Sequence, residues 1–340
     1  MKKQIKYIIT GAVVLGAIAA AFVADRYFTD YKKNVAEKFT LYIGPDTNIS
    51  QITDTLEGKL LNLKSFQRCF RRENPSGNIA AGYYSIKGNT TNKQLARTLT
   101  KGWQTPYRLT LSGNIRGVEK LAGVLGKKMM RDSAEFSNWF NDPKVWEECG
   151  LSQETFPIIF IPNTYEMYWT ATPEDFTKRM LKEYNKFWNE ERTKKAEELG
   201  MTKSKVSILA SIVCEESNYN PELPTIAGVY LNRLKRGMKL EADPTVKFAL
   251  NDPTIKRILF KHLKVDSPYN TYKVQGLPPG PITIPSAAGI DAVLYYKQHD
   301  YLYFCASEKL DGTHKFARTL SQHNKNARAY QSAISKLKIK

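Results

Sequence analysis

The sequence has few of the residues that build metal centres and disulfide frameworks. It contains four cysteines and four histidines among 340 residues, and the cysteines at 69, 149, 214 and 305 form no CxxC pair and no paired Cys/His spacing. This pattern argues against a zinc site and against a dense set of disulfides. No internal repeat or low-complexity stretch is visible, and the apolar and charged contents are ordinary, so we expect a globular body.

Acidic side chains are scarce relative to basic ones. Fifty-one Lys and Arg stand against 33 Asp and Glu, which gives a formal net charge of +18 at pH 7. Such an excess predicts an anionic partner, which can be nucleic acid, an anionic lipid surface or an acidic polymer. The charge alone does not choose among these partners.

A long uncharged stretch lies near the N-terminus. Three lysines in the first six residues precede residues 7–24, YIITGAVVLGAIAAAFVA, which carry no charge. This length just suffices for a membrane span, and the cationic flank predicts that the chain after Asp25 lies outside the cytoplasm. We expect residues 1–30 to form a cytoplasmic stub and a single-pass anchor in the cell (inner) membrane. The alternative is a cleaved signal peptide, because residues 19–21 resemble a peptidase site. An anchored body outside the cytoplasm argues against a nucleic-acid partner.

Strand and helix patterns alternate after the anchor. Residues 31–38 are typical of a polar stalk, and residues 39–105 predict the order strand, helix, helix, strand, helix, with a stop at Gly102. A unit of this size is a plausible module. Residues 106–340 mix further strands and helices. We therefore expect an α+β protein with an N-terminal transmembrane helix, a small β-α-α-β-α module and a larger mixed α+β domain.

Two segments of the larger domain have distinctive patterns. Residues 173–199 predict one long amphipathic helix with Thr172 as its N-cap and Gly200 as its stop. Residues 159–169, IFIPNTYEMYW, mix aromatic side chains with a Pro-Asn pair, and this mixture predicts an ordered loop.

A pair of glutamates closes an apolar helical run in SIVCEESNYN, residues 211–220. With 3.6 residues per turn, one helix face is an apolar stripe made of Ile208, Leu209, Ile212 and Val213. Glu216 projects near the middle of that stripe, whereas Glu215 lies to its side and is expected to reach solvent. Desolvation and the C-terminal end of the helix dipole both raise a carboxyl pKa, as a general acid near neutral pH requires. The alternative is a frayed helix end with both carboxylates in water.

Further motifs follow one another in a fixed order along the chain. They are AGYYSIKGNTTNKQL, RLTLSGNIRG, FIPNTYEMYW, ASIVCEES, IAGVYLNRLKRGMKLEADPTVKFAL, YNTYKVQGLPPGPI, YLYFCA and HKFARTLSQHN. In this order, and with the N-terminal anchor, the chain resembles the endolytic murein transglycosylases, also called the YceG-like family. The resemblance covers nearly the whole chain. It implies that the module at 39–105 is LysM-like, a glycan-binding type, and that residues 106–340 form the catalytic transglycosylase domain.

The resemblance also assigns the acid chemistry to one residue. The family pattern is similar to ASIVEKET, and its second, catalytic glutamate falls on Glu216, while Cys214 replaces the first glutamate and Glu215 the lysine. It implies lytic cleavage of the bond between N-acetylmuramic acid and N-acetylglucosamine in peptidoglycan glycan strands. In the chemistry that the resemblance implies, Glu216 would protonate the departing glycosidic oxygen and then take the proton of the muramyl C6 hydroxyl, which would leave a 1,6-anhydro end without any metal or cofactor. The expected role is to end the elongation of nascent strands, with cell-wall synthases as candidate partners.

Five residues are candidates for substrate binding. Tyr269, Asn270 and Tyr272 offer aromatic faces and amide groups beside GLPPGP, with loop packing as the equal alternative. Glu241 stands where the family usually has glutamine and can line the cleft. Asp243 either lines the cleft or caps the helix that follows it. Structural roles are expected for four other polar residues: Asn232, Arg233, His314 and His323.

Two other functions fit parts of the sequence. A non-catalytic glycan-binding scaffold would explain why Cys214 replaces a family glutamate. A hydrolytic muramidase would need a second carboxylate near Glu216, and its products would carry a reducing end.

Overall fold

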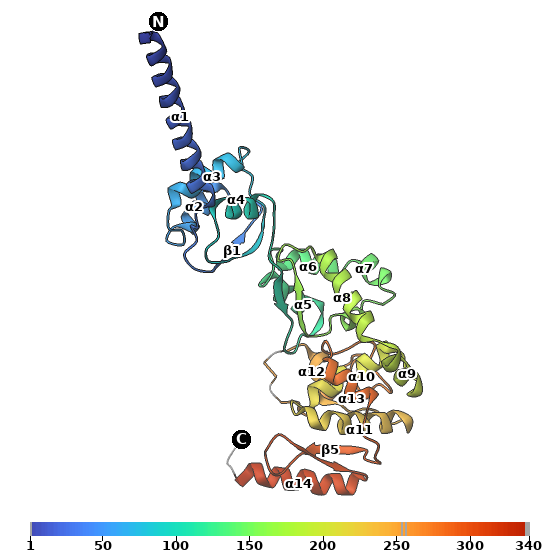
Figure 1. The fold of residues 1–340 in the computed structure, drawn as a ribbon. Coiled ribbons are helices and arrows are strands. Elements are labelled where there is room, and N and C mark those ends of the chain that lie inside the picture. The colour runs from blue at the N-terminus through green and yellow to red at the C-terminus, as the bar shows by residue number, and fades with distance from the viewer. Residues whose placement is uncertain (1, 253, 256, 337–340) are drawn as a thin grey trace. The chain divides into compact units, whose positions relative to one another are not determined.

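The computed structural model describes residues 2–252, 254–255 and 257–336 (Figure 1). The last four residues of the predicted catalytic domain, 337–340, therefore lie outside the described residues. The chain divides into two compact units. Unit 1 comprises Met1–Leu109 and Tyr165–Ala171, and unit 2 comprises Thr110–Thr164 and Thr172–Lys340.

Unit 1 begins with one uninterrupted helix, α1 (Lys2–Tyr31). The segment Lys3–Tyr31 has a mean hydropathy of 2.3 in its most apolar window, and none of that window is buried by the protein. Its uncharged part spans roughly 27 Å at 1.5 Å per residue, close to the thickness of a hydrocarbon core. By length and composition the helix can cross a membrane, and a signal sequence near the N-terminus would meet the same criteria.

The rest of unit 1 confirms the predicted order of strands and helices. The elements are β1 (Phe39–Ile43), α2 (Ile49–Leu56), α3 (Leu63–Glu73), β2 (Gly82–Ile86) and α4 (Asn92–Thr100). β1 and β2 pair antiparallel, with Phe39 opposite Ile86. The three helices begin at Asn48, Asn62 and Thr91, whose side chains accept hydrogen bonds from the first turn. Their apolar faces bury Phe66, Phe70 and Leu95 around the two strands.

Two short strands lie where the chain passes between the units. β3 (Tyr107–Thr110) pairs with β4 (Thr164–Met167), and Leu111 donates its backbone N–H to the carbonyl of Asn163. β4 falls inside residues 159–169, so the prediction of a loop for that whole segment was wrong. Alternation in β4, which buries Tyr165 between exposed neighbours, is too short a signal to be seen in the sequence.

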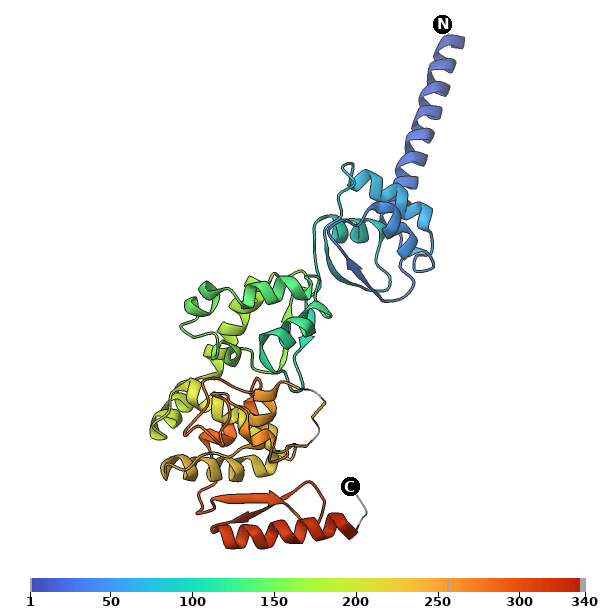
Figure 2. The same cartoon turned by 180° about the vertical axis from the view of Figure 1, so that it is seen from behind.

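Unit 2 is mainly helical and ends in a strand pair with one long helix (Figure 2). Its strands β5 (Tyr303–Ala306) and β6 (His314–Ala317) pair antiparallel, and α14 (Leu320–Lys336) packs on them. The other α-helices are α5 (Gly117–Gly126), α6 (Ser133–Phe140), α7 (Pro143–Glu148), α8 (Pro173–Phe187), α9 (Glu190–Glu198), α10 (Lys203–Glu216), α11 (Leu223–Lys235), α12 (Asp243–Leu250) and α13 (Ala287–Leu294). Three short 3₁₀ turns complete it: η1 (Phe156–Ile159), η2 (Asn220–Glu222) and η3 (His262–Lys264).

The long helix predicted for residues 173–199 is divided into α8 and α9. Thr172 caps α8 as predicted, and Gly200, with φ +65°, follows α9. Between them Trp188 turns into the core, where it is 4% exposed. Asn189 leaves the helical conformation and accepts a hydrogen bond from the backbone of Arg192, so it begins a new helix.

Helix α10 forms the centre of unit 2. Every residue from Val206 to Val213 is buried, and the helix packs against α11 and α13. It is therefore buried on all sides rather than along one stripe, as expected for a core helix. Burial of each large aliphatic side chain contributes about 1.5–3 kcal/mol, which makes α10 a rigid support for its last residue.

Candidate functional site

Glu216 is the last residue of α10, and the chain leaves the helix at Ser217 with extended backbone angles. Its side chain lies at the boundary between the buried core and the surface. The hydroxyl of Tyr230, on α11, donates a hydrogen bond to Glu216 Oε1 over 2.5 Å. Since α10 and α11 pack side by side, the carboxyl is fixed at the end of a rigid helix pair.

The surroundings of Glu216 disfavour its charge. Burial raises the pKa of Glu216 to about 7, the hydrogen bond from Tyr230 opposes that rise, and the negative charges of Asp243 and Glu215 add to it. The raised pKa agrees with the expectation from the helix pattern. A carboxyl group with this pKa can donate and accept a proton near neutral pH.

Glu215 is placed differently from the prediction. Its side chain is only 6% exposed, and its Oε2 pairs with Nη2 of Arg116 at 2.5 Å. Oε1 is buried and has no hydrogen-bond partner among the described residues. The expectation that Glu215 reaches solvent was wrong, because the residue preceding α5 covers the end of α10.

Glu216 borders two adjoining hollows, of about 400 Å³ and about 550 Å³. Glu216, Ala306 and His314 line both, so the two hollows form one groove with the carboxyl group where they meet. The polar part of the first hollow is made of Glu216, Tyr230, Arg233, Glu241, Asp243, Tyr272, Tyr303, His314 and His323. A third hollow of about 200 Å³ is lined by Cys214 and shares Ser217 and Asn218 with the second.

Asp243 and Tyr272 face the first hollow as a pair. The hydroxyl of Tyr272 donates to Asp243 Oδ1 over 2.7 Å. Burial, and then the bond to Asp243, raise the pKa of Tyr272, so its hydroxyl stays protonated. The residue at the N-cap of α12 is Ala242, and no side chain caps that helix. The alternative that Asp243 is a helix cap was therefore wrong.

Arg233 and Glu241 form a structural ion pair at the wall of the first hollow. Nη1 of Arg233 lies 3.0 Å from Glu241 Oε2, and the buried guanidinium also donates to the carbonyls of Leu240 and Leu302. Glu241 itself has a left-handed backbone conformation, with φ +53°. The structural role predicted for Arg233 is confirmed.

Three of the other polar residues have the structural contacts expected of them. Asn232 donates to the carbonyls of His299 and Tyr301. His314 contacts Glu222 through Nδ1 at 2.8 Å, although its ring also lines the groove. His323 packs on the ring of Tyr303.

Two of the five candidates for substrate binding are engaged in the packing of the loop that carries them. Asn270 is fully buried, its Nδ2 donates to the carbonyls of Leu263 and Val265, and its Oδ1 accepts from the backbone of Tyr272. Tyr269 packs against Phe248 with ring centroids 4.7 Å apart. The structure thus gathers Tyr272, Glu241 and Asp243 around the hollow of Glu216, and it places Tyr269 and Asn270 in the packing of the loop.

Sequence reasoning missed Tyr230 and Arg116. Tyr230 is 14 residues from Glu216 in sequence and lies on another helix, and Arg116 is 99 residues from Glu215. No local pattern connects such pairs; the only signal was that both residues fall within motifs that the family resemblance singled out. Among the described residues, no group of three or more His, Cys, Asp and Glu side chains is placed to hold a metal ion.

Comparison with known proteins agrees with this arrangement. The YceG-like family matches residues 41–329. The chain is 32% identical over 291 residues to an endolytic murein transglycosylase of Bacillus subtilis (strain 168), which covers 79% of this chain and 78% of that protein. It is 25% identical to an endolytic murein transglycosylase of Streptococcus pneumoniae, over 86% of this chain and 58% of the longer relative.

A solved structure shows the same fold. The crystal structure of a YceG-like protein from Listeria monocytogenes aligns with a TM-score of 0.59 and 28% sequence identity, and it covers 85% of this chain and 98% of that one. Because the family matches most of the chain and the Bacillus relative exceeds 30% identity over most of both proteins, this chain belongs to the YceG-like family.

Proposed function

We propose that this protein is an endolytic lytic transglycosylase of peptidoglycan, with Glu216 as its single acid and base. The observation that carries the proposal is the position of Glu216, which lies at the meeting point of two hollows with a pKa raised to about 7. The names of its relatives, endolytic murein transglycosylases, support the same reaction class.

The reaction uses Glu216 twice. In the first step the protonated carboxyl gives its proton to the glycosidic oxygen between N-acetylmuramic acid and N-acetylglucosamine as the C1–O bond breaks. In the second step the carboxylate removes the proton of the muramyl C6 hydroxyl while that oxygen bonds to C1. The product is a 1,6-anhydro end, Glu216 regains its proton, and no water or cofactor is consumed.

Tyr230 determines which carboxyl oxygen carries the proton. Its hydroxyl donates to Oε1 of Glu216, so that oxygen acts as an acceptor. Oε2 makes no hydrogen bond with the described residues, and we assign it the transferred proton. The same bond stabilises the carboxylate form that the second step requires.

The groove offers hydrogen-bonding groups for sugars on the side of the first hollow. Tyr272 and Asp243 present a tyrosine ring and a carboxylate, and Glu241 presents a second carboxylate that is 46% exposed. These three residues are our substrate-binding candidates. Tyr269 and Asn270 then act indirectly, by holding the loop that carries Tyr272.

The remaining parts of the chain give the enzyme its place in the cell envelope. We propose that α1 anchors the protein in the cell membrane and that the chain after Asp25 lies outside the cytoplasm, in the periplasm of a cell with two membranes. Residues 39–105 are then a LysM-like module that binds glycan, and residues 106–340 act on nascent strands and end their elongation. Cell-wall synthases, which make those strands, are the candidate protein partners.

Hydrolysis is the second candidate reaction, because carboxylates other than Glu216 line the same hollow. Asp243 and Glu241 could activate a water molecule, as the second acid of a glycosidase does. A non-catalytic scaffold has less support. Cys214 lines the third hollow and lies 3.5 Å from Ser286 Oγ, and it is not among the residues that line the hollows of Glu216.

The test is mass spectrometry of purified peptidoglycan digested by the full chain and by Glu216→Gln. We expect 1,6-anhydromuramyl products from the parent and roughly 10²–10⁴-fold less from the variant. Glu198→Gln, which changes an exposed residue of α9, is the matched control. Reducing-end products would show a hydrolase, and equal product from parent and Glu216→Gln would remove Glu216 from the chemistry.

A further inference from the structure

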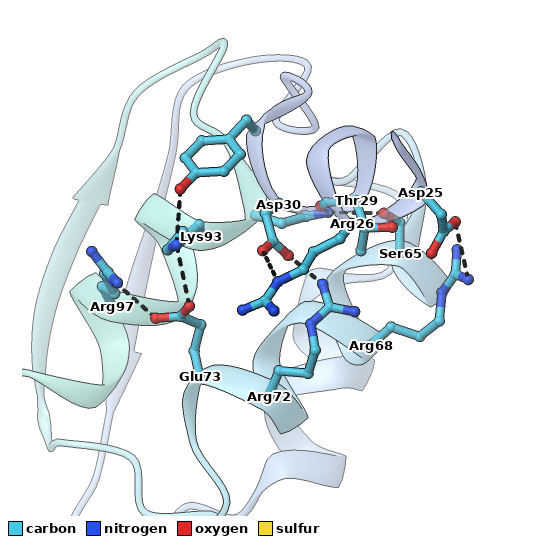
Figure 3. Close-up of polar contacts among 12 residues, drawn as sticks. Asp25, Arg26, Thr29, Asp30, Ser65, Arg68, Arg72, Glu73, Lys93 and Arg97 are labelled. Carbon is cyan, nitrogen blue, oxygen red and sulfur yellow. Dashed lines mark hydrogen bonds and ion pairs between the residues drawn. The ribbon is translucent and has the colours of Figure 1, made fainter. Parts of the chain in front are cut away.

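The last turns of α1 are bound to α3 and α4 of unit 1 by polar contacts (Figure 3). Thr29 and Asp30 are only 4% and 2% exposed. The carboxylate of Asp30 accepts a hydrogen bond from Arg72 on α3, and the amide of Asn92 on α4 donates to the carbonyl of Thr29 over 2.8 Å. The helix is therefore joined rigidly to the module through its last turn.

Three contacts define how α3 crosses α1. At one end of α3, Arg72 meets Asp30 of α1 directly. At its other end, Ser65 accepts a hydrogen bond from Asn92 of α4, whose amide also donates to the carbonyl of Thr29. In its middle, Arg68 instead reaches back to Asp25, with Nη1 and Oδ1 3.7 Å apart (Figure 3). Asp25 directly follows the apolar run, so the side of α3 that carries Arg68 is directed toward the apolar segment.

That side of α3 is a basic stripe. Lys64, Arg68 and Arg71 are spaced four and three residues apart, which places them on one helix face, and all three are exposed. The opposite face buries Phe66 and Phe70 in the core. The acidic residue at the end of α3, Glu73, pairs with Lys93 and Arg97.

The helical geometry sets the depth of this stripe. Asp25 is the first residue beyond the uncharged segment, and Asp30 lies roughly 9 Å beyond Ala24 at 1.5 Å per residue. The headgroup layer of a bilayer is about 5–8 Å thick on each side of the hydrocarbon core. If α1 fills the hydrocarbon core, α3 lies at the level where lipid phosphates begin.

We propose that the module of residues 39–105 rests on the phospholipid headgroups of the membrane crossed by α1, with Lys64, Arg68 and Arg71 contacting lipid phosphates. Charge complementarity and the rigid junction select this occupant. The proposal depends on the membrane span of the proposed function and is independent of the transglycosylase activity.

The test measures how fast single lysines react with a water-soluble acylating reagent in the full chain, reconstituted into lipid nanodiscs. An anionic leaflet has a surface potential of about −30 mV, which concentrates protons locally and slows acylation of a nearby lysine roughly threefold. We expect this slowing at Lys64 when phosphatidylcholine is replaced by phosphatidylglycerol. Lys101, exposed at the end of α4 remote from α1, is the internal control and should keep its rate.

A spacer variant separates proximity from any general effect of the lipid. Seven helix-forming residues inserted between Ala24 and Asp25 would lift the module by about 10 Å and turn it by only about 20°. The lift exceeds the Debye length at physiological salt. The slowing at Lys64 should then disappear. Equal rates at Lys64 in the two lipids, in protein that co-purifies with the discs, would overturn the proposal, as would the same slowing with the spacer present. Failure of the chain to co-purify would overturn the span and the surface contact together, whereas loss of transglycosylase activity alone would affect neither.

Discussion

The hydrogen bond from the hydroxyl of Tyr230 to Glu216 controls the pKa of the Glu216 carboxyl, so removing that one hydroxyl tests it. Because this bond lowers the pKa of Glu216, its loss in Tyr230→Phe should raise that pKa. The active form of the first step is protonated, so the alkaline limb of the pH–rate profile should move upward by about one pH unit. We also expect the maximal rate to fall about tenfold, because the carboxyl loses its fixed orientation. Rates of anhydro-product release across the pH range measure both effects.

Tyr295→Phe is the matched control for this change. It removes the hydroxyl that bonds Glu191 at the surface, far from the groove lining. Its pH–rate profile should coincide with that of the parent. A Tyr230→Phe profile with an unmoved alkaline limb would show that the tyrosine does not tune Glu216.

The raised pKa of Glu216 also makes a prediction for stability. In the unfolded chain this carboxyl titrates near its ordinary 4.5, and in the folded protein near 7. Below pH 4.5 both states are protonated and the effect is absent; as pH rises toward 7 the unfolded state ionises first and stability falls. Above pH 7 the ionised carboxylate costs up to about 3 kcal/mol.

Glu216→Gln removes this cost, because glutamine keeps an acceptor for Tyr230 without a charge. In urea unfolding followed at pH 8, the variant should be more stable than the parent, and the two should coincide at pH 4. A variant less stable than the parent at pH 8 would contradict a desolvated carboxylate at this position.

At the scale of single residues, the sequence predicted that Glu216 lies against apolar side chains. It did not predict the polar residues that contact the two glutamates. Helical periodicity placed its side chain against apolar residues, and this is a local property of α10. The bond from Tyr230 and the ion pair between Arg116 and Glu215 join separate elements. Such contacts depend on how helices pack, which no spacing within one helix records.

Among the elements, the contact between α10 and α13 allows a sharp test. A Cβ at Gly289 on α13 would lie 2.1 Å from Cys214 Sγ, so the sulfur of Cys214 occupies the space that a side chain at position 289 would need. We expect Gly289→Ala to lower the free energy of unfolding by about 1–3 kcal/mol. The added Cys214→Ala substitution removes the sulfur atom and should restore most of the loss.

The measurement is a double-mutant cycle. It compares the thermal unfolding of the parent, the two single variants and the double variant. Gly123→Ala in α5 is the control, since a Cβ there meets nothing within 4 Å. It should leave stability unchanged or raise it by up to about 1 kcal/mol. Additive effects of the two substitutions would mean that the contact is not the cause.

Elements with local signals were predictable, and those set by packing were not. Side-chain caps such as Thr172 and the alternating pattern of β1 and β2 are written in adjacent residues. The break between α8 and α9 depends on the burial of Trp188. The orientation of α9 depends on the ion pair between Arg192 and Asp291 of α13. In the sequence alone, nothing distinguishes Asn189 from the other polar residues of the predicted solvated helix.

For the whole molecule, the division into two compact units predicts two unfolding transitions. Leu95 is fully buried in the core of unit 1, so Leu95→Ala should destabilise that unit by about 2–5 kcal/mol. Scanning calorimetry should show one transition lowered by Leu95→Ala and the other by Gly289→Ala. A single transition that both variants lower equally would show that the units unfold together.

The division itself is visible only in part from the sequence. The resemblance to the YceG-like family was confirmed because it rests on many ordered motifs. The assignment of Tyr165–Ala171 to unit 1 could not be read from the order of the chain, since these residues follow 55 residues of unit 2.

The rigid junction between α1 and the module has a consequence for how the enzyme finds its substrate. If α1 spans the membrane as proposed, a protein held by such a junction moves in a plane, by lateral diffusion, and encounters only strands that lie within its reach of the bilayer. Mature wall further away is then outside its search area, whatever the affinity of the groove. Under the proposed function, newly made glycan, still close to the membrane where it is polymerised, would then be selected as substrate by its location rather than by recognition of strand length.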